Sequence, residues 1–200
     1  MQEREARRSN PERAEATRKA LIEAARRLFV EKSYADTATP DIATAAGVTR
    51  GALYHHFDDK QALFRAVVEQ EAAHVAEEIE RATPATLAAK GALLKGGEAF
   101  LDAMAAPGRT RLLLLDGPAV LGRTAMDRID GEHSARTLRE GLSMAMEEGT
   151  MKKAPPDALA ALLSAAFDRA ALAIEAGATR QEIEAALAVV IEGLFIDRSG

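Results

Sequence analysis

The sequence contains no cysteine and no tryptophan, and aromatic residues make up only 4% of its 200 positions. Without cysteine there is no disulfide and no thiolate metal site, which suits a reducing compartment. No stretch approaches the roughly 18 uninterrupted apolar residues that mark a membrane span. The charged opening, residues 1–19, lacks the apolar core of a signal peptide. These absences lead us to expect a cytoplasmic protein with no membrane contact.

Patterns that support catalysis are missing as well. There is no His-x-x-x-His spacing: His55 and His56 are adjacent and lie on different faces of a helix, and His74 and His133 stand alone. There is also no glycine-rich phosphate loop and no nucleophile elbow. We therefore expect neither an enzyme nor a bound metal or cofactor.

The residues that are present favour helices. Hydrophobic residues make up 48% of the chain, and with so few aromatics the core must consist of Ala, Leu, Ile and Val. This composition, with few β-branched runs, predicts an all-α fold.

Charge divides unevenly along the chain. Residues 1–60 carry 11 Lys/Arg and 10 Asp/Glu, whereas residues 61–200 carry 15 and 21. An acidic C-terminal part repels DNA, so any DNA contact is expected in the N-terminal part. The alternative interpretation is that both balances are ordinary surface charge.

The most informative stretch is TPDIATAAGVTRGALYHHFDDK, residues 39–60. Thr39 is predicted to cap a short helix with Pro40 at its first position, and Gly47 is predicted to end it. A second short helix follows, capped by Thr49, and Leu53 on that helix points inward. Two short helices joined by a tight turn are the pattern of a helix-turn-helix.

Residues 17–67 as a whole closely resemble the DNA-binding domain of TetR-type (tetracycline-repressor-like) transcriptional regulators. A bare helix-turn-helix pattern is weak, but Gly-Val-Thr-Arg-Gly-Ala-Leu-Tyr-His-His-Phe followed by Asp-Lys-Gln-Ala-Leu-Phe is specific. One departure is Ser33-Tyr34, where the family usually has Gly-Tyr. A left-handed helix end there costs Ser about 1 kcal/mol relative to Gly.

The resemblance implies a DNA-binding domain over residues 1–60, with residues 1–10 as a flexible arm, and a helical effector-binding and dimerisation domain over residues 61–200. Arg4, Arg7 and Arg8 of the arm either enter a minor groove or belong to a solvated tail. The glycine and proline positions predict about nine helices. They are expected at residues 10–32, 39–46, 50–56, 59–81, 85–106, 109–122, 123–149, 156–176 and 179–196.

By the same resemblance, the protein is a transcriptional regulator, expected to be a repressor, that binds a pseudo-palindromic operator as a homodimer. Arg50 is the candidate for base contact, because its guanidinium can pair with guanine O6 and N7. His56 and Lys60 match phosphate-contacting positions. Tyr54 either faces the groove or covers the small core, and His55 either faces the groove or is merely exposed. The expected DNA-contacting residues are Thr39, Thr49, Arg50, Gly51, Tyr54, His55, His56 and Lys60.

The C-terminal part carries weaker signals. Its last two helices are apolar over much of their surface, which indicates either dimerisation or an intramolecular core. The expected dimer residues are Leu159, Leu163, Phe167, Ala170, Ile174, Ile183, Leu187, Val190 and Leu194. A small apolar effector, of unknown identity, is expected to contact Phe100, Met104, Leu114, Met126, Met144 and Phe167, with Asp127, His133 and Asp168 as polar candidates. These residues are equally compatible with plain core, and a helical DNA-binding structural protein without ligand control is the alternative function.

Overall fold

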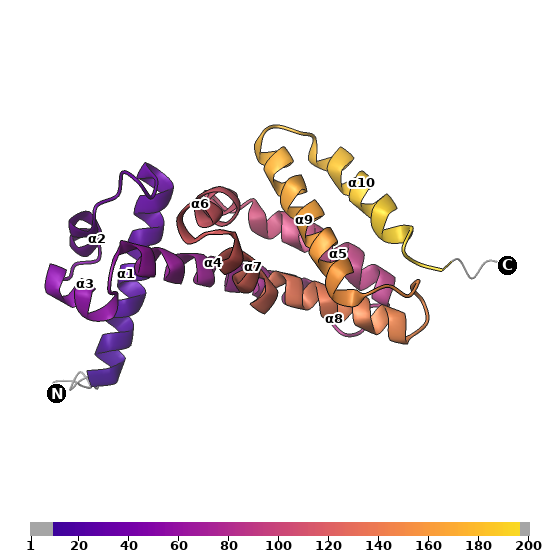
Figure 1. Cartoon of the computed structure of the whole chain (residues 1–200), viewed down its shortest axis with the longest axis horizontal. Helices are drawn as coiled ribbons and strands as arrows, with labels where there is room; N and C mark the ends of the chain where they lie inside the picture. Colours follow the sequence, from indigo (N-terminus) through magenta and orange to yellow (C-terminus); the bar gives the residue numbers. More distant parts are fainter. Residues whose placement is uncertain (1–9, 197–200) are drawn as a thin grey trace, which may run out of the picture. The chain divides into compact units, whose positions relative to one another are not determined.

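The computed structural model describes residues 10–196, and within that range the chain forms ten α-helices and one π-helical turn (Figure 1). The expected all-α fold is confirmed. The elements are α1 (Asn10–Lys32), α2 (Thr39–Ala45), α3 (Arg50–His56), α4 (Lys60–Ala82), α5 (Ala89–Met104), the π-helical turn η1 (Arg111–Asp116), α6 (Gly117–Leu121), α7 (Arg123–Glu132), α8 (Ser134–Glu147), α9 (Pro156–Glu175) and α10 (Arg180–Glu192).

The chain divides into two compact units, one ending at Val68 and the other beginning at Glu69. The boundary lies inside α4, eight residues beyond the position expected from the sequence, so one continuous helix contributes to both units. We call the described residues 10–68 the head and residues 69–196 the body. The expected arm, including Arg4, Arg7 and Arg8, lies outside the described residues apart from position 10.

The head has a small core built on α1. Leu21, Ala25 and Phe29 follow helical spacing and are each 0% exposed, so they form the apolar stripe by which α1 packs in the head. The Phe29 ring contacts Phe64 of α4 with centroids 5.2 Å apart. Three helices and the start of α4 thus enclose one tightly packed centre.

Two local features connect the head's helices. Ser33 follows α1 with φ +85°. This is the left-handed conformation that the family usually gives to a glycine at this position. The Ser33 hydroxyl contacts Asp36 Oδ2 at 3.0 Å and accepts the Asp36 N–H at 3.3 Å, which offsets part of the strain. At the start of α4, Asp59 accepts the Ala62 N–H at 2.7 Å, as a capping residue does.

The body packs α8 against α5, α7 and α9, while α10 covers α5 and runs beside α9 (Figure 1). An isolated antiparallel bridge between Met151 and Phe195 ties the segment after α8 to the segment after α10. Among the described residues, no helix combines the length and apolar character that crossing a membrane requires.

The body also departs from the expected helix boundaries. The predicted helix at 123–149 is two helices, because the backbone at His133 (φ −123°, ψ −106°) interrupts it. The predicted helix at 109–122 has nearly the expected extent, because residues 109–121 are helical throughout, but its middle, η1, is π-helical and is followed by the short α6. Pro118 has no N–H to donate to the preceding turn, and a wider turn is one way a helix accommodates such a loss.

Candidate DNA-binding surface and ligand cavity

The turn between α2 and α3 has the geometry expected of a helix-turn-helix. Gly47 takes φ +69°, and its N–H donates to Thr44 O at 3.1 Å while the Val48 N–H donates to Ala43 O at 3.0 Å. These two bonds form a Schellman motif, which ends α2 sharply. Thr49 then caps α3, since its hydroxyl accepts the Ala52 N–H at 3.1 Å. The predictions that Gly47 ends α2 and that Thr49 caps α3 are confirmed.

One face of α3 is buried and the other is open. Leu53 is 0% exposed and Phe57, which follows the helix, is 6% exposed, so both anchor α3 in the head. Arg50, Gly51 and His55 are exposed, and Tyr54 is 42% exposed. The side chains on this open face are hydrogen-bonding groups, as direct contact with base edges requires.

The predicted capping role of Thr39 is wrong. Ala38 occupies the N-cap position and makes no side-chain cap, and Thr39 is the first residue of α2. The Thr39 hydroxyl instead hydrogen-bonds the Tyr54 hydroxyl at 3.2 Å. Arg50 lies over the Tyr54 ring, with Cζ 5.5 Å from the centroid. Hydrogen bonds from Thr39 and then Arg50 lower the pKa of Tyr54, so these three side chains form one connected group on the surface.

Lys60 is half-buried and already bound within the head. Its Nζ donates to Tyr34 O at 2.8 Å and Thr37 O at 3.0 Å, and lies 4.3 Å from the Tyr34 ring centroid. An ammonium group has three donors, so these two bonds leave one for another acceptor. The sequence indicated a charge for DNA at this position but gave no sign of its structural role.

A cavity of about 400 Å³ opens in the body. Its apolar walls include Leu93 and Phe100 of α5 and Phe167 of α9, each less than 10% exposed. The end of α4 contributes Ile79, Glu80 and Thr83. Gly97 makes room for the Phe167 ring, because a Cβ there would lie 2.8 Å from its carbons.

Three of the six predicted effector residues line this cavity, namely Phe100, Met144 and Phe167. Met104, Leu114 and Met126 do not, because Met104 is part of the core and Leu114 and Met126 belong to η1 and α7, away from the lining. Of the polar candidates, Asp127 is exposed and His133 lies between α7 and α8. Neither residue belongs to the cavity lining.

Asp168 is the third polar candidate and is largely enclosed. Burial, and secondarily the nearby Asp130 carboxylate, raises the pKa of Asp168 to about 7. Asp130 accepts the Ser164 hydroxyl at 2.7 Å, and burial raises its pKa also. Ser164 lines the cavity, whereas the two carboxyl groups lie outside the lining.

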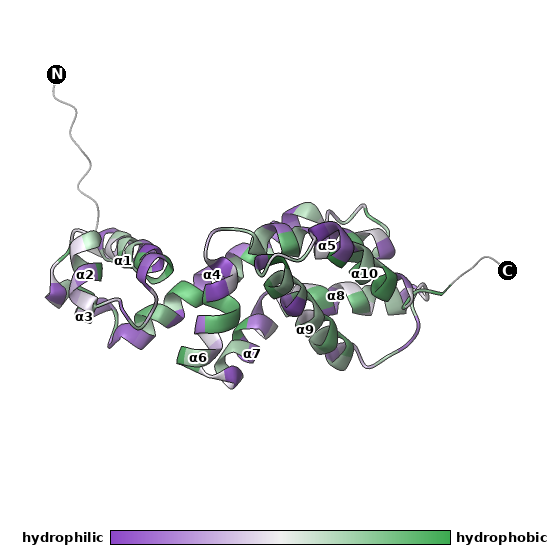
Figure 2. Ribbon diagram, turned by 90° about the horizontal axis from the view of Figure 1, so that it is seen from above, coloured by the Kyte–Doolittle hydropathy of each residue, from purple (hydrophilic) through white to green (hydrophobic). Residues whose placement is uncertain are grey.

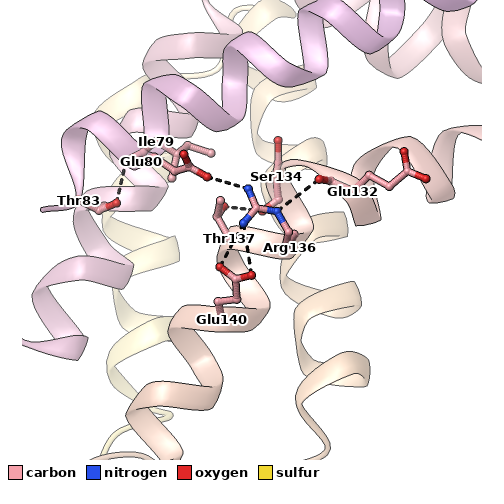
Figure 3. A network of polar contacts seen from close by, with 8 residues as sticks. All are labelled: Ile79, Glu80, Thr83, Glu132, Ser134, Arg136, Thr137 and Glu140. Atoms are coloured by element: carbon pink, nitrogen blue, oxygen red, sulfur yellow. Dashed lines mark hydrogen bonds and ion pairs between the residues drawn. The ribbon is translucent and has the colours of Figure 1, made fainter. Parts of the chain in front are cut away.

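The sequence missed the residues that form the polar part of the cavity wall, since exposed Glu, Ser and Thr on helices carry no distinguishing pattern. Glu80, Glu140 and Glu148 are the charged residues of the lining. Arg136 donates to Glu80 Oε1 at 2.8 Å and to both carboxylate oxygens of Glu140 at 3.3 Å (Figure 3).

The predicted dimer residues fall into three groups by their exposure. Leu163, Phe167 and Ala170 are only 5–6% exposed within a single chain, so they pack in the body's own core and offer little surface to a second copy. Val190 is 50% exposed. The others, Leu159, Ile174, Ile183, Leu187 and Leu194, are half-buried.

The outer surface of α9 and α10 is formed mainly by side chains that were not among the predicted dimer residues. Figure 2 draws these two helices mainly in green, the colour of hydrophobic residues. Leu162 is 71% and Val189 is 70% exposed. Helical spacing surrounds them with small apolar residues, so the surface is apolar and shallow. We call it the α9/α10 surface; its exposed members are Ala158, Ala161, Leu162, Ala165, Ala185, Ala186, Val189 and Val190.

Comparison with known proteins matches both units. Residues 21–67 match the family model of bacterial regulatory proteins, tetR family. Residues 90–195, more than half of the chain, match that of the tetracyclin repressor-like C-terminal domain. Together the two matched segments include the helix-turn-helix and most of the cavity walls.

Among curated relatives, the HTH-type transcriptional regulator TtgR of Pseudomonas putida is 47% identical over 62 residues, which are 31% of this chain and 30% of that protein. The alignment with such relatives thus spans about a third of their length. The transposon Tn10 TetC protein of Escherichia coli is 28% identical over 78% of this chain and 79% of its own.

Among solved structures, a TetR-family transcriptional regulator from Pectobacterium atrosepticum superposes with a TM-score of 0.75 at 31% identity, covering 95% of this chain and 99% of that one. A structure from a Shewanella species, at 20% identity and TM-score 0.74, shares the fold. The chain therefore belongs to the TetR family of bacterial transcriptional regulators, non-enzymatic proteins that bind operator DNA through a helix-turn-helix, usually as dimers.

Proposed function

We propose that this chain is a cytoplasmic repressor that binds a pseudo-palindromic operator as a homodimer and is released by a small molecule held in the body cavity. The observation that carries the proposal is the open face of α3, where Arg50, Tyr54 and His55 project from a helix anchored by a fully buried Leu53. A helix fixed on one side and polar on the other is suited to a major groove.

Arg50 is the residue we assign to base contact, because a guanidinium can pair with guanine through two hydrogen bonds, worth about 1–3 kcal/mol of discrimination. Its position over the Tyr54 ring favours an extended side chain and lowers the entropy lost on binding. Thr39, Thr49, His56 and Lys60 are assigned to phosphate, Gly51 to close backbone approach, and Tyr54 and His55 to the groove.

The α9/α10 surface is our candidate dimer interface. Exposed Leu162, Val189 and Val190 on two adjacent helices leave apolar area that a second copy would remove from water, at about 25 cal/mol per Å². Two helices from each copy make a four-helix arrangement. The small alanines between them permit close helix approach, which supports a self-complementary contact.

The cavity favours ligand control over the alternative of a structural DNA-binding protein. The end of α4 lines the cavity through Ile79, Glu80 and Thr83, and the start of the same helix belongs to the head. A ligand that binds one arrangement of α4 better than another shifts the population of DNA-competent molecules. An empty space of about 400 Å³ falls in the size range of small-molecule sites.

The test is fluorescence anisotropy with a labelled operator and a scrambled duplex, across a range of salt concentrations. Arg50→Ala should remove about 1–3 kcal/mol of preference for the operator while leaving the salt dependence unchanged. Lys60→Ala should weaken binding to both duplexes and flatten the salt dependence. Equal effects of the two substitutions would contradict the division between base and phosphate contact.

The dimer is tested by light scattering on Leu162→Glu and Val189→Glu, with Leu115→Glu as the control, since Leu115 is 50% exposed but lies on η1. The first two variants should become monomeric and lose operator affinity; the control should remain dimeric. If all three behave as the parent protein, another surface forms the dimer.

A further inference from the structure

The polar lining of the cavity is uniform in sign. Its charged members are Glu80, Glu140 and Glu148, and no Lys, Arg or His belongs to the described lining. The walls behind them are apolar, with Phe100 and Phe167 in contact at a ring-centroid distance of 5.7 Å. The cavity thus combines apolar walls with a mouth, formed by the three glutamates, whose own charged residues are all negative.

Three of the four hydroxyl side chains in the lining, all except that of Ser134, donate their proton within the protein. Thr83 donates to Ile79 O at 2.8 Å, Thr137 to Ser134 O at 2.8 Å, and Ser164 to Asp130 at 2.7 Å. Figure 3 shows the first two bonds. Because these three protons are already used within the protein, the lone pairs of the three oxygens remain for a ligand that donates.

Two positive features near the cavity are already neutralised. Arg136 is paired with Glu80 and Glu140, and its Nε donates to Glu132 O at 3.4 Å (Figure 3). The start of α8, where a helix dipole attracts anions, is occupied by Asp130, which accepts the Ala135 N–H. An anionic ligand would have to displace a carboxylate from either place.

Glu148 leaves the cavity mouth with a net negative charge. It forms no ion pair with any residue in the described part of the chain, whereas Arg136 supplies one positive charge against the two of Glu80 and Glu140. The mouth therefore has an excess of negative charge next to an apolar cavity. From this arrangement we infer that the effector is an amphipathic cation: an apolar body that fills the cavity and an ammonium or amidinium group that lies among the glutamates.

This inference rests on the proposed function, since it specifies the ligand of the same cavity, and it also predicts the site of coupling. An ammonium group at the mouth competes with Arg136 for Glu80 of α4. Binding therefore weakens the ion pair that joins α4 to α8, at the 2.8 Å contact between Arg136 and Glu80.

The experiment uses three probes of similar size and different charge: 4-phenylbutylamine, 4-phenylbutanol and 4-phenylbutyrate. Calorimetry on the intact chain at neutral pH and low salt should give the amine about tenfold higher affinity than the carboxylate, with the alcohol between them. Ala92→Phe, which fills the cavity from α5, should weaken all three probes.

Two substitutions should change amine affinity in opposite directions. Glu148→Gln should lower it about threefold, because one partly screened charge is lost; Glu147→Gln, an exposed neighbour outside the lining, is the control and should change nothing. Arg136→Gln should raise amine affinity, since it frees Glu80 and Glu140. An anion-binding cavity requires the reverse.

The inference is overturned if the carboxylate binds as tightly as the amine, if none of the probes binds, or if Glu148→Gln and Glu147→Gln act alike. Operator binding without any probe, measured in parallel by anisotropy, reports separately on the proposed function. A chain that binds operator but prefers phenylbutyrate would retain the repressor assignment and lose the cationic effector.

Discussion

The head and the body of this chain are both helical, yet their interiors are packed differently. The head surrounds an aromatic cluster in which Phe64 contacts Phe29 and Tyr34 at centroid distances of 5.2 and 4.9 Å. The body contains an open cavity, a π-helical turn and a buried ion pair between Arg109 and Glu71 at 2.9 Å.

Under the proposed function, the difference suits what each unit does. A surface that contacts DNA has to hold its side chains in one geometry, and close packing provides this. A unit that responds to a ligand needs empty space and interactions that have two arrangements. The buried polar contact of the body is made by Arg109, which is 6% exposed and joins Glu71 and Glu78 of α4 to the segment before η1.

The largest effect should come from truncating matched phenylalanines in the two units. Phe64→Ala removes a 0% exposed ring from the head and should cost about 3–5 kcal/mol of unfolding free energy. Phe100→Ala enlarges a cavity that is already open, so it should cost about 2 kcal/mol. Denaturant unfolding followed by circular dichroism measures both; equal losses would mean that the two cores are equally tight.

The second prediction concerns the buried carboxyl of the body. The pKa of Asp168 in the folded state, about 7, lies above the ordinary value of 3.8 for an aspartate, so protonation favours folding. The corresponding stability is complete below about pH 4 and is lost as the pH rises through 7.

Asp168→Asn should therefore stabilise the protein at pH 8, on the order of 1–3 kcal/mol, and flatten the dependence of stability on pH. Thermal unfolding from pH 5 to 8 measures this. The control is Asp157→Asn on the same helix, where the side chain is 84% exposed. If stability depends on pH in the same way in both variants, Asp168 is not the group responsible for that dependence.

Lys60 offers a smaller test, within the head. Lys60→Met retains the apolar stem but removes the donors to Tyr34 O and Thr37 O, so unfolding free energy should fall by about 1–2 kcal/mol. Arg50→Ala, on the open face, should leave stability unchanged. Hydrogen exchange at residues 33–38 measures the first effect; unchanged exchange there would make Lys60 a DNA contact alone.

The smallest effect is expected at Ser33. Ser33→Gly relieves the left-handed backbone at φ +85° but loses the hydrogen bonds with Asp36, so the net change should be within about 0.5 kcal/mol. Ser33→Ala keeps the strain and loses the bonds, and should be about 1 kcal/mol less stable than the Gly variant. Thermal unfolding of the two variants measures the difference. If the Ala variant proves more stable than the Gly variant, backbone strain at residue 33 is negligible.

Sequence reasoning was most accurate where interactions are local. The bounds of α1 and α3, the Schellman turn at Gly47 and the Thr49 cap all depend on residues within a few positions of each other. Local reasoning failed at Thr39 by one position, because its hydroxyl is taken by Tyr54, fifteen residues away. The predicted helix at 123–149 failed at His133, where the backbone conformation separates α7 from α8, and no residue pattern near that position marks the break.

By itself the sequence determined the all-helical fold, the helix-turn-helix and the apolar character of the last two helices, since each depends on spacing along one helix or turn. Only the tertiary structure decided which side of an apolar helix is covered. It turned Leu163 and Phe167 inward, left Leu162 and Val189 exposed, and brought Glu80, Glu140 and Glu148 to one cavity. The physical reason is that burial depends on neighbours distant in the chain, and a helix apolar on several faces does not specify which one they cover.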